Sequence, residues 1–200
     1  MLSDSFQGKI QNLGVPVAVL FLGLVAYLGV REPRSLAFVF FGGLMAFVTR
    51  ELGQRAVAHL MNADVNTHLS KNGSMLTLFT GFIAALFGYP LAILLPSENS
   101  YEMRAHEQWG QVVDVIWSKR EFWLAVGGIM ALTLISTLLF LLGQNTLAQI
   151  ISVYTLSQMI PLREIIVKRS TDGAYILFHS GFMWLTFTGF NIMLLTVAVF

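Results

Sequence analysis

The chain has no cysteine and few charged residues for its 200-residue length. Without cysteine it can form neither a disulfide nor a thiolate metal site. Charged residues make up 12% of the sequence, against about 25% in soluble domains. No basic patch is interleaved with aromatic residues, and this absence argues against binding to nucleic acid. The composition therefore favours a membrane protein over a soluble one.

Hydrophobic residues make up 56% of the chain, and a helix needs about 20 apolar residues to cross a bilayer. Six segments approach or exceed this length: residues 13–30, 35–61, 73–95, 121–142, 146–162 and 174–200. The first run has no small-residue cleavage site after it, so we expect a retained helix rather than a signal peptide. We expect residues 1–200 to form a single all-α polytopic membrane domain with five to six transmembrane helices in the lipid bilayer.

The segment at residues 73–95 is interrupted by Phe-Gly-Tyr-Pro at residues 87–90. A proline in a helix interior costs about 3 kcal/mol, so this segment either spans or turns back as a re-entrant hairpin. The positive-inside rule compares Lys and Arg on the two sides of the membrane. With Arg50 set aside inside its helix, a spanning segment gives eight against three and a hairpin gives nine against two. Charge alone therefore leaves both arrangements open.

Residues 50–54 read Arg-Glu-Leu-Gly-Gln in the second half of an apolar segment. In metalloproteases a helix with His-Glu-x-x-His uses the two His as zinc ligands and the Glu as general base. Here Arg50 and Gln54 occupy the ligand positions, and Glu51 remains. Because an Arg side chain has no lone pair to offer a metal, the motif has the spacing of a zinc helix without its ligands.

Two further landmarks follow in order. Residues 123–128 (Trp-Leu-Ala-Val-Gly-Gly) are rich in small residues, and residues 158–162 (Gln-Met-Ile-Pro-Leu) precede Asp172-Gly173. Together with residues 50–54, these segments resemble the site-2 protease family of intramembrane zinc metalloproteases over residues 35–176. In this comparison residues 123–128 look like the family's small-residue helix start. The apolar stretch at residues 76–95 looks closest to archaeal members.

The resemblance implies a site-2 protease-like core in which Asp172 stands at the third zinc-ligand position. Arg50, Gln54 and Asp172 are then the positions of a degenerate metal site. Glu51 is the only match to the family's general base, and Gln158 stands where the family has Asn. We therefore expect no catalytic residue, no metal and no cofactor.

These departures favour a catalytically inactive member, a pseudoprotease, that acts as an accessory or structural subunit of a membrane complex or binds a transmembrane partner. The resemblance also implies five spans plus a hairpin, a prokaryotic plasma membrane and a cytoplasmic N-terminus. Two other functions remain open. One is an active metalloprotease with unorthodox ligands, and the other is a small transporter or channel component, which would need more polar groups along a water path.

Several interpretations of Arg50 and Glu51 are open. The uncharged residues 35–49 rise about 22 Å, so Arg50 could lie at the membrane interface, and Glu51 with Arg55 has the spacing of a surface helix pair. Alternatively, Arg50 pairs with Asp172 or Glu51 in place of the metal, while Gln54 donates an amide hydrogen bond. A last alternative is that the insertion at residues 163–171 pushes Asp172 into a loop.

Histidines and glycines complete the candidate residues. No two of the four histidines have the i,i+3 or i,i+4 spacing of a helical metal site, which argues against a replacement site: His59, His68, His106 and His179. Small residues allow close contact between helices in lipid, so we expect helix packing at four glycines: Gly42, Gly43, Gly127 and Gly128. Aromatic residues gather at membrane interfaces, and we expect this role for Tyr101 and three tryptophans: Trp109, Trp117 and Trp123.

Overall fold

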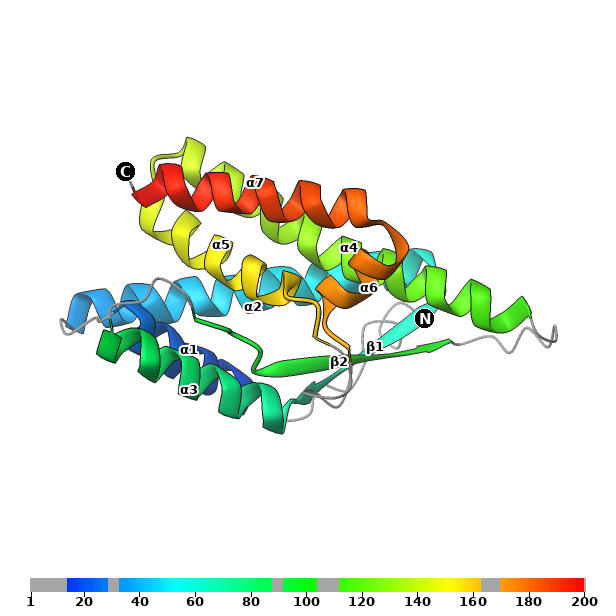
Figure 1. Ribbon diagram of the computed structural model, residues 1–200, viewed down its shortest axis with the longest axis horizontal. Coiled ribbons are helices and arrows are strands. Elements are labelled where there is room, and N and C mark those ends of the chain that lie inside the picture. The colour runs from blue at the N-terminus through cyan, green and yellow to red at the C-terminus, as the bar shows by residue number, and fades with distance from the viewer. Residues whose placement is uncertain (1–13, 29–32, 88–91, 104–111, 163–169, 200) are drawn as a thin grey trace, which may run out of the picture.

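The structure, a computed structural model, describes residues 14–28, 33–87, 92–103, 112–162 and 170–199. Within these ranges the chain forms seven helices and one two-stranded sheet (Figure 1). The helices are α1 (Gly14–Leu28), α2 (Pro33–Leu60), α3 (Lys71–Phe87), α4 (Val112–Leu141), α5 (Asn145–Met159), α6 (Asp172–His179) and α7 (Gly181–Val199), and the strands are β1 (Ala63–Leu69) and β2 (Ser97–Met103). The fold is mostly helical as expected, but the all-α prediction is wrong because of the sheet.

The sheet is formed by two polar stretches that lie between the six predicted apolar segments. β1 and β2 are antiparallel, with Leu69 opposite Ser97. Along β1, Ala63, Val65 and Thr67 are buried, and the residues between them are only partly buried. This two-residue period is that of a strand with one packed face. The buried face lies against the C-terminal part of α2.

The segment at residues 71–95 turns back on itself instead of crossing the molecule. The Ser70 amide donates to the Pro96 carbonyl at 3.1 Å, so the two ends of the segment are adjacent. Gly73 permits this approach, because a Cβ there would lie 2.1 Å from the Leu95 carbonyl oxygen. The two ends of the segment therefore lie side by side, as a hairpin requires.

After α3 the chain returns in an extended form, and side chains of α3 hold the returning backbone. The Ile93 amide donates to Thr80 Oγ1 at 2.9 Å, and the Leu95 amide donates to Thr77 Oγ1 at 2.8 Å. On the other side Ser157 Oγ of α5 donates to the Ala92 carbonyl at 3.0 Å. These bonds satisfy backbone groups that have no strand beside them.

Helix α2 lies between two layers of helices (Figure 1). α1 and α3 cover one side of it, and α4, α5 and α7 form the other side. All four glycines expected at helix contacts lie at such contacts. A Cβ on Gly42 would meet Ile150 of α5, one on Gly43 would meet Leu24 of α1, and one on Gly127 or Gly128 would meet α2. Close packing around α2 fixes the positions of its polar residues.

Two helices among the described residues contain segments long and apolar enough to cross a membrane, Ser35–Leu60 and Lys119–Leu141. Gly14–Ala26 and Gly181–Val197 are shorter apolar helices.

Two helix boundaries differ from those that the sequence predicts. The predicted single segment at residues 174–200 is divided at Ser180, whose extended backbone (φ −153°, ψ 91°) separates α6 from α7. Residues 123–128 do not start a helix, because α4 already begins at Val112.

Candidate functional site

Arg50 of α2 and Asp172 of α6 form a buried ion pair. Arg50 Nε lies 2.7 Å from Asp172 Oδ2, and both side chains are 3% exposed. Gln54, one turn further along α2, donates from Nε2 to the same oxygen at 3.0 Å. The expected contact is therefore present. The alternatives of a water-facing Arg50 and of an Asp172 displaced into a loop are wrong.

Glu51 is held from several directions. Arg50 Nη1 lies 3.4 Å from Glu51 Oε1, and Arg55 Nε lies 3.9 Å from Oε2. The sheet supplies the closer partners: Thr67 Oγ1 donates to Oε2 at 2.5 Å, and Asn99 Nδ2 donates to Oε1 at 2.9 Å. Both carboxylate oxygens already accept hydrogen bonds from the protein. A general base needs access to the proton it removes, and this arrangement does not favour that role for Glu51.

Thr67 and Asn99 are site residues that sequence analysis missed. They lie opposite each other in the sheet, on β1 and β2. Asn99 Nδ2 also donates to Gln54 Oε1, so the sheet binds two of the three polar residues of the α2 motif. In the sequence, the alternation of Ala63, Val65 and Thr67 with more polar residues was the available signal, but it spans only seven residues.

The start of α6 places Asp172 at this site. Thr171 Oγ1 donates to the Ile160 carbonyl at 2.5 Å, and the Leu162 amide donates to Thr171 Oγ1 at 3.1 Å, so the ends of the 162–171 loop are tied together. Gly173 abuts the last turn of α5, where a Cβ would lie 2.1 Å from the Met159 carbonyl oxygen. Asp172 sits in the first turn of α6, where a negative charge is favoured by the helix dipole.

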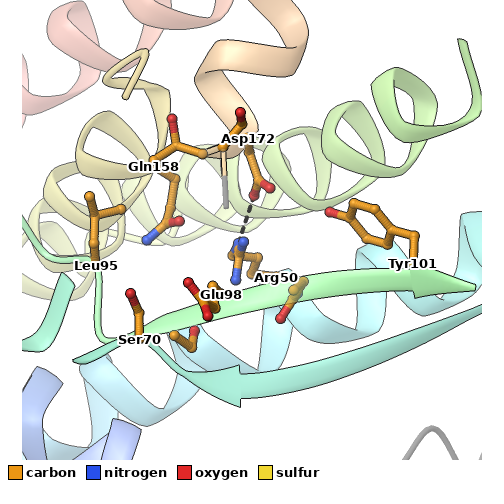
Figure 2. A pocket seen from close by; sticks show the side chains of 11 residues that line it. Arg50, Ser70, Leu95, Glu98, Tyr101, Gln158 and Asp172 are labelled. Carbon is orange, nitrogen blue, oxygen red and sulfur yellow. Dashed lines mark hydrogen bonds and ion pairs between the residues drawn. The ribbon is translucent and has the colours of Figure 1, made fainter. Parts of the chain in front are cut away.

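A small polar pocket lies beside the ion pair (Figure 2). Its cavity volume is about 20 Å³, enough for one water-sized group. Figure 2 shows Gln158 and Asp172 on one side of the pocket, and Ser70 and Glu98 beside the strands on the other. Gln158, expected at the family's Asn position, donates from Nε2 to the Leu94 carbonyl at 2.8 Å. Its amide is thus engaged with the returning segment after α3.

Tyr101 of β2 also lines the pocket and is 7% exposed, so the expectation of an interface anchor is wrong for this residue. Its ring lies 6.4 Å from that of Tyr175 in an edge-on arrangement. Burial raises the pKa of Tyr101 well above its ordinary value, and the negative charge of Asp172 raises the pKa further. The phenol therefore keeps its proton at neutral pH. Trp109 lies outside the described residues.

The histidines are dispersed. His59 is exposed, His68 Nε2 lies 3.1 Å from Ser100 Oγ, and His179 stacks on Phe122. His106 lies outside the described residues. In the part of the chain that the structure describes, no three His, Cys, Asp or Glu residues are grouped as metal ligands. What the site offers is a guanidinium between two carboxylates, bounded by amide and hydroxyl groups.

Comparisons with protein-family models, with curated proteins and with solved structures give no match for this chain.

Proposed function

We propose that this chain is a catalytically inactive, site-2 protease-like membrane protein, a pseudoprotease that serves as an accessory subunit or binds a transmembrane partner. One observation carries the proposal. Asp172 is 122 residues from Arg50 and 118 residues from Gln54 in the sequence, yet the three positions that the resemblance assigns to metal ligands meet at one carboxylate oxygen. If these positions derive from a metal site, their side chains are expected to lie together in this way.

The chemistry of the three side chains supports the loss of activity. A catalytic zinc needs several lone-pair donors and activates the water bound to it. Arg50 offers no donor atom to a metal, and its positive charge already neutralises Asp172. Gln54 donates its amide hydrogen to the same oxygen. A guanidinium in this place supports the two helices electrostatically, as a metal would, but it does not lower the pKa of a water.

We propose a membrane topology in which α1, α2, α4, α5 and α7 span and the segment at residues 71–95 dips in and returns. The adjacent ends of that segment support this, as do large apolar side chains exposed along α3: Met75, Phe79, Phe82 and Leu86. α1 begins and α5 ends toward the same end of the molecule (Figure 1). The positive-inside rule then favours a cytoplasmic N-terminus. α1 and α5, at 15 residues each, require a locally thin bilayer.

Cysteine labelling tests this topology, because the chain has no native cysteine. Single cysteines replace Met1 and Phe200 in otherwise unchanged protein. We expect a membrane-impermeant thiol reagent to reach the first from the cytoplasmic side only and the second from the outside only. Labelling of both from one side contradicts five spans plus a hairpin.

Metal restoration tests the degenerate site. We expect protein purified without chelators to contain no stoichiometric zinc, and the Arg50→His/Gln54→His variant to bind about one zinc per chain. Adding Asp172→Asn to that variant should remove the metal. Elemental analysis measures all three proteins. Zinc in the unaltered chain that disappears with Asp172→Asn would show an active-type site and overturn the pseudoprotease. Absence of zinc from the double variant would overturn the degenerate-site argument.

Partner binding is tested in native membranes. We expect a membrane protein to co-purify in constant proportion with the full chain, as measured by quantitative mass spectrometry after mild detergent extraction. Cleavage of that protein by the purified chain would contradict inactivity. A chain that purifies alone from cross-linked membranes contradicts the accessory role.

A further inference from the structure

Three consecutive residues of β2 each carry an oxygen atom that is buried without a hydrogen-bond partner in the described part of the chain. These atoms are Ser97 Oγ, Glu98 Oε2 and Asn99 Oδ1. All three residues line the pocket beside the ion pair (Figure 2). Ser97 is 5% exposed and Asn99 is 7% exposed. A buried polar atom without a hydrogen-bond partner is unfavourable, so these three oxygens favour an occupant that can donate hydrogen bonds to them.

The unpartnered atoms are acceptors. The Asn99 amide nitrogen is already used, because it donates to Glu51 and to Gln54. This orientation leaves Oδ1, which can only accept, facing no donor. A carboxylate oxygen of Glu98 likewise only accepts, and the Ser97 hydroxyl can accept as well. An occupant must therefore bring hydrogen-bond donors and needs no acceptor.

Charge and size restrict the occupant further. The pocket lining contains the cation Arg50 and the carboxylates Glu98 and Asp172, a net charge of −1. Arg50 donates hydrogen bonds to Asp172 and Glu51, and its ion pairs within the described part of the chain are with these two residues and not with Glu98. The cavity volume of about 20 Å³ admits one water-sized group and excludes a guanidinium.

We propose that this pocket binds a primary ammonium group. An ammonium has three donors and no acceptor, so it can donate to unpartnered oxygens of the lining, and it supplies the missing positive charge. Its head is close to a water molecule in size. The ammonium comes either from a lysine of the partner, an assignment that rests on the proposed function, or from a small free amine. Binding of an ammonium group in the pocket does not depend on which of these two molecules supplies it.

The first experiment uses the purified full chain with methylammonium chloride as the probe. Sodium chloride and tetramethylammonium chloride at equal ionic strength are controls, because neither cation has an N–H donor. At ten times its dissociation constant, methylammonium should raise the Tm by about 3–6 °C relative to both controls. Equal Tm values in all three salts overturn the proposal and leave the pocket to ordered water.

Glu98→Gln is the variant that locates the effect, since Glu98 lies outside the Arg50–Asp172 pair. We expect it to weaken the methylammonium response at least fivefold. Asp64→Asn removes the same charge from the same sheet but from a residue that does not line the pocket. It should respond like the unaltered chain. A Glu98→Gln protein that responds fully, or an Asp64→Asn protein that does not respond, overturns the assignment to this pocket.

The second experiment identifies the source of the amine. A carbodiimide joins a carboxylate to a primary amine in direct contact, so native membranes are treated with it and the Glu98 peptide is analysed by mass spectrometry. A branched peptide carrying a lysine from another protein supports the partner. A small mass addition supports a free amine and counts against the partner's lysine only. Loss of the methylammonium response in the first experiment overturns the pocket itself, whether or not a partner co-purifies.

Discussion

Two groups of buried polar side chains lie in this mostly apolar molecule, and they are built differently. The first, here called the charged network, joins Arg50, Glu51, Gln54 and Asp172 with Thr67 and Asn99 of the sheet. The second, here called the hydroxyl cluster, lies among α4, α5 and α7. It contains Thr133, Ser136, Ser152 and Asn191. Both connect helices, but only the first contains charges.

Three members of the hydroxyl cluster have a second partner that is a backbone carbonyl of a helix. Thr133 Oγ1 donates to the Ile129 carbonyl at 2.9 Å, and Asn191 Nδ2 donates to the Phe187 carbonyl at 2.9 Å. Ser136 Oγ donates to the Ala148 carbonyl and lies 2.7 Å from Ser152 Oγ. Thr133 and Asn191 therefore each keep a hydrogen bond to a backbone carbonyl when the other side chain is removed. Each link therefore contributes little on its own.

In the charged network the second partner of Arg50 is more distant than the first, because Glu51 Oε1 lies at 3.4 Å and Asp172 Oδ2 at 2.7 Å. Arg50 and Asp172 are 122 residues apart in sequence, and each is buried against the other. An ion transferred from water into a protein interior loses several kcal/mol of hydration, which an opposite charge offsets only while it is present. The comparison teaches that neutral polar contacts in a helical core are replaceable, whereas a buried charge depends on its partner.

The largest predicted effect on stability comes from a substitution in the charged network, and it tests whether the two groups differ. We expect Asp172→Asn to lower the free energy of unfolding by about 3–5 kcal/mol, because it leaves the buried Arg50 without its main counter-charge. Ser136→Ala in the hydroxyl cluster should lower it by only about 0.5–1 kcal/mol. Denaturant titration in one detergent measures both variants.

The double variant Arg50→Met/Asp172→Leu separates a stranded charge from lost packing. It removes both ions and replaces them with apolar groups, so it should recover most of the stability lost in Asp172→Asn. If the double variant is as unstable as Asp172→Asn, the loss of stability in the single variant arises from altered packing and not from an unpaired charge. If Asp172→Asn and Ser136→Ala cost the same, the distinction between the two groups is wrong.

The contact between Arg50 and Asp172 was predictable, and the elements around it were not. An Arg and an Asp within apolar segments need each other, and the family resemblance supplied the pairing. The sheet was missed because β1 alternates over only seven residues in a polar stretch. The break at Ser180 has only a weak sequence signal, the Ser180-Gly181 dipeptide, with no proline or Asp, Glu, Lys or Arg beside it. Tertiary contacts decide both features.

The pocket was also beyond sequence reasoning. Ser97, Glu98 and Asn99 stand in the long hydrophilic stretch after residue 95, which resembles an ordinary solvated loop. They become distinctive only when the return from α3 and the pairing with β1 bury them beside Asp172.

The role of the glycine after Asp172 was likewise not visible in the sequence. An Asp-Gly pair is a common turn sequence, and only the fold shows why a glycine is needed here.

A smaller effect sharpens the comparison by asking what holds Asp172 in place. A Cβ at Gly173 would lie 2.1 Å from the Met159 carbonyl oxygen and 2.3 Å from its carbon, both rigid backbone atoms at the end of α5. Gly173→Ala must therefore move the start of α6 away from α5, and Asp172 away from Arg50. We expect a loss of about 1–3 kcal/mol in unfolding free energy.

Gly189→Ala is the matched control, because no atom lies within 4 Å of a Cβ there. In the interior of α7 an alanine should be neutral or stabilising by up to about 1 kcal/mol. Zinc binding gives a second measurement, since Gly173→Ala should weaken the metal affinity of the Arg50→His/Gln54→His variant while Gly189→Ala leaves it unchanged. If both glycine variants behave alike in stability and in zinc affinity, α6 is not fixed by its contact with α5, and the charged network must position Asp172 by itself.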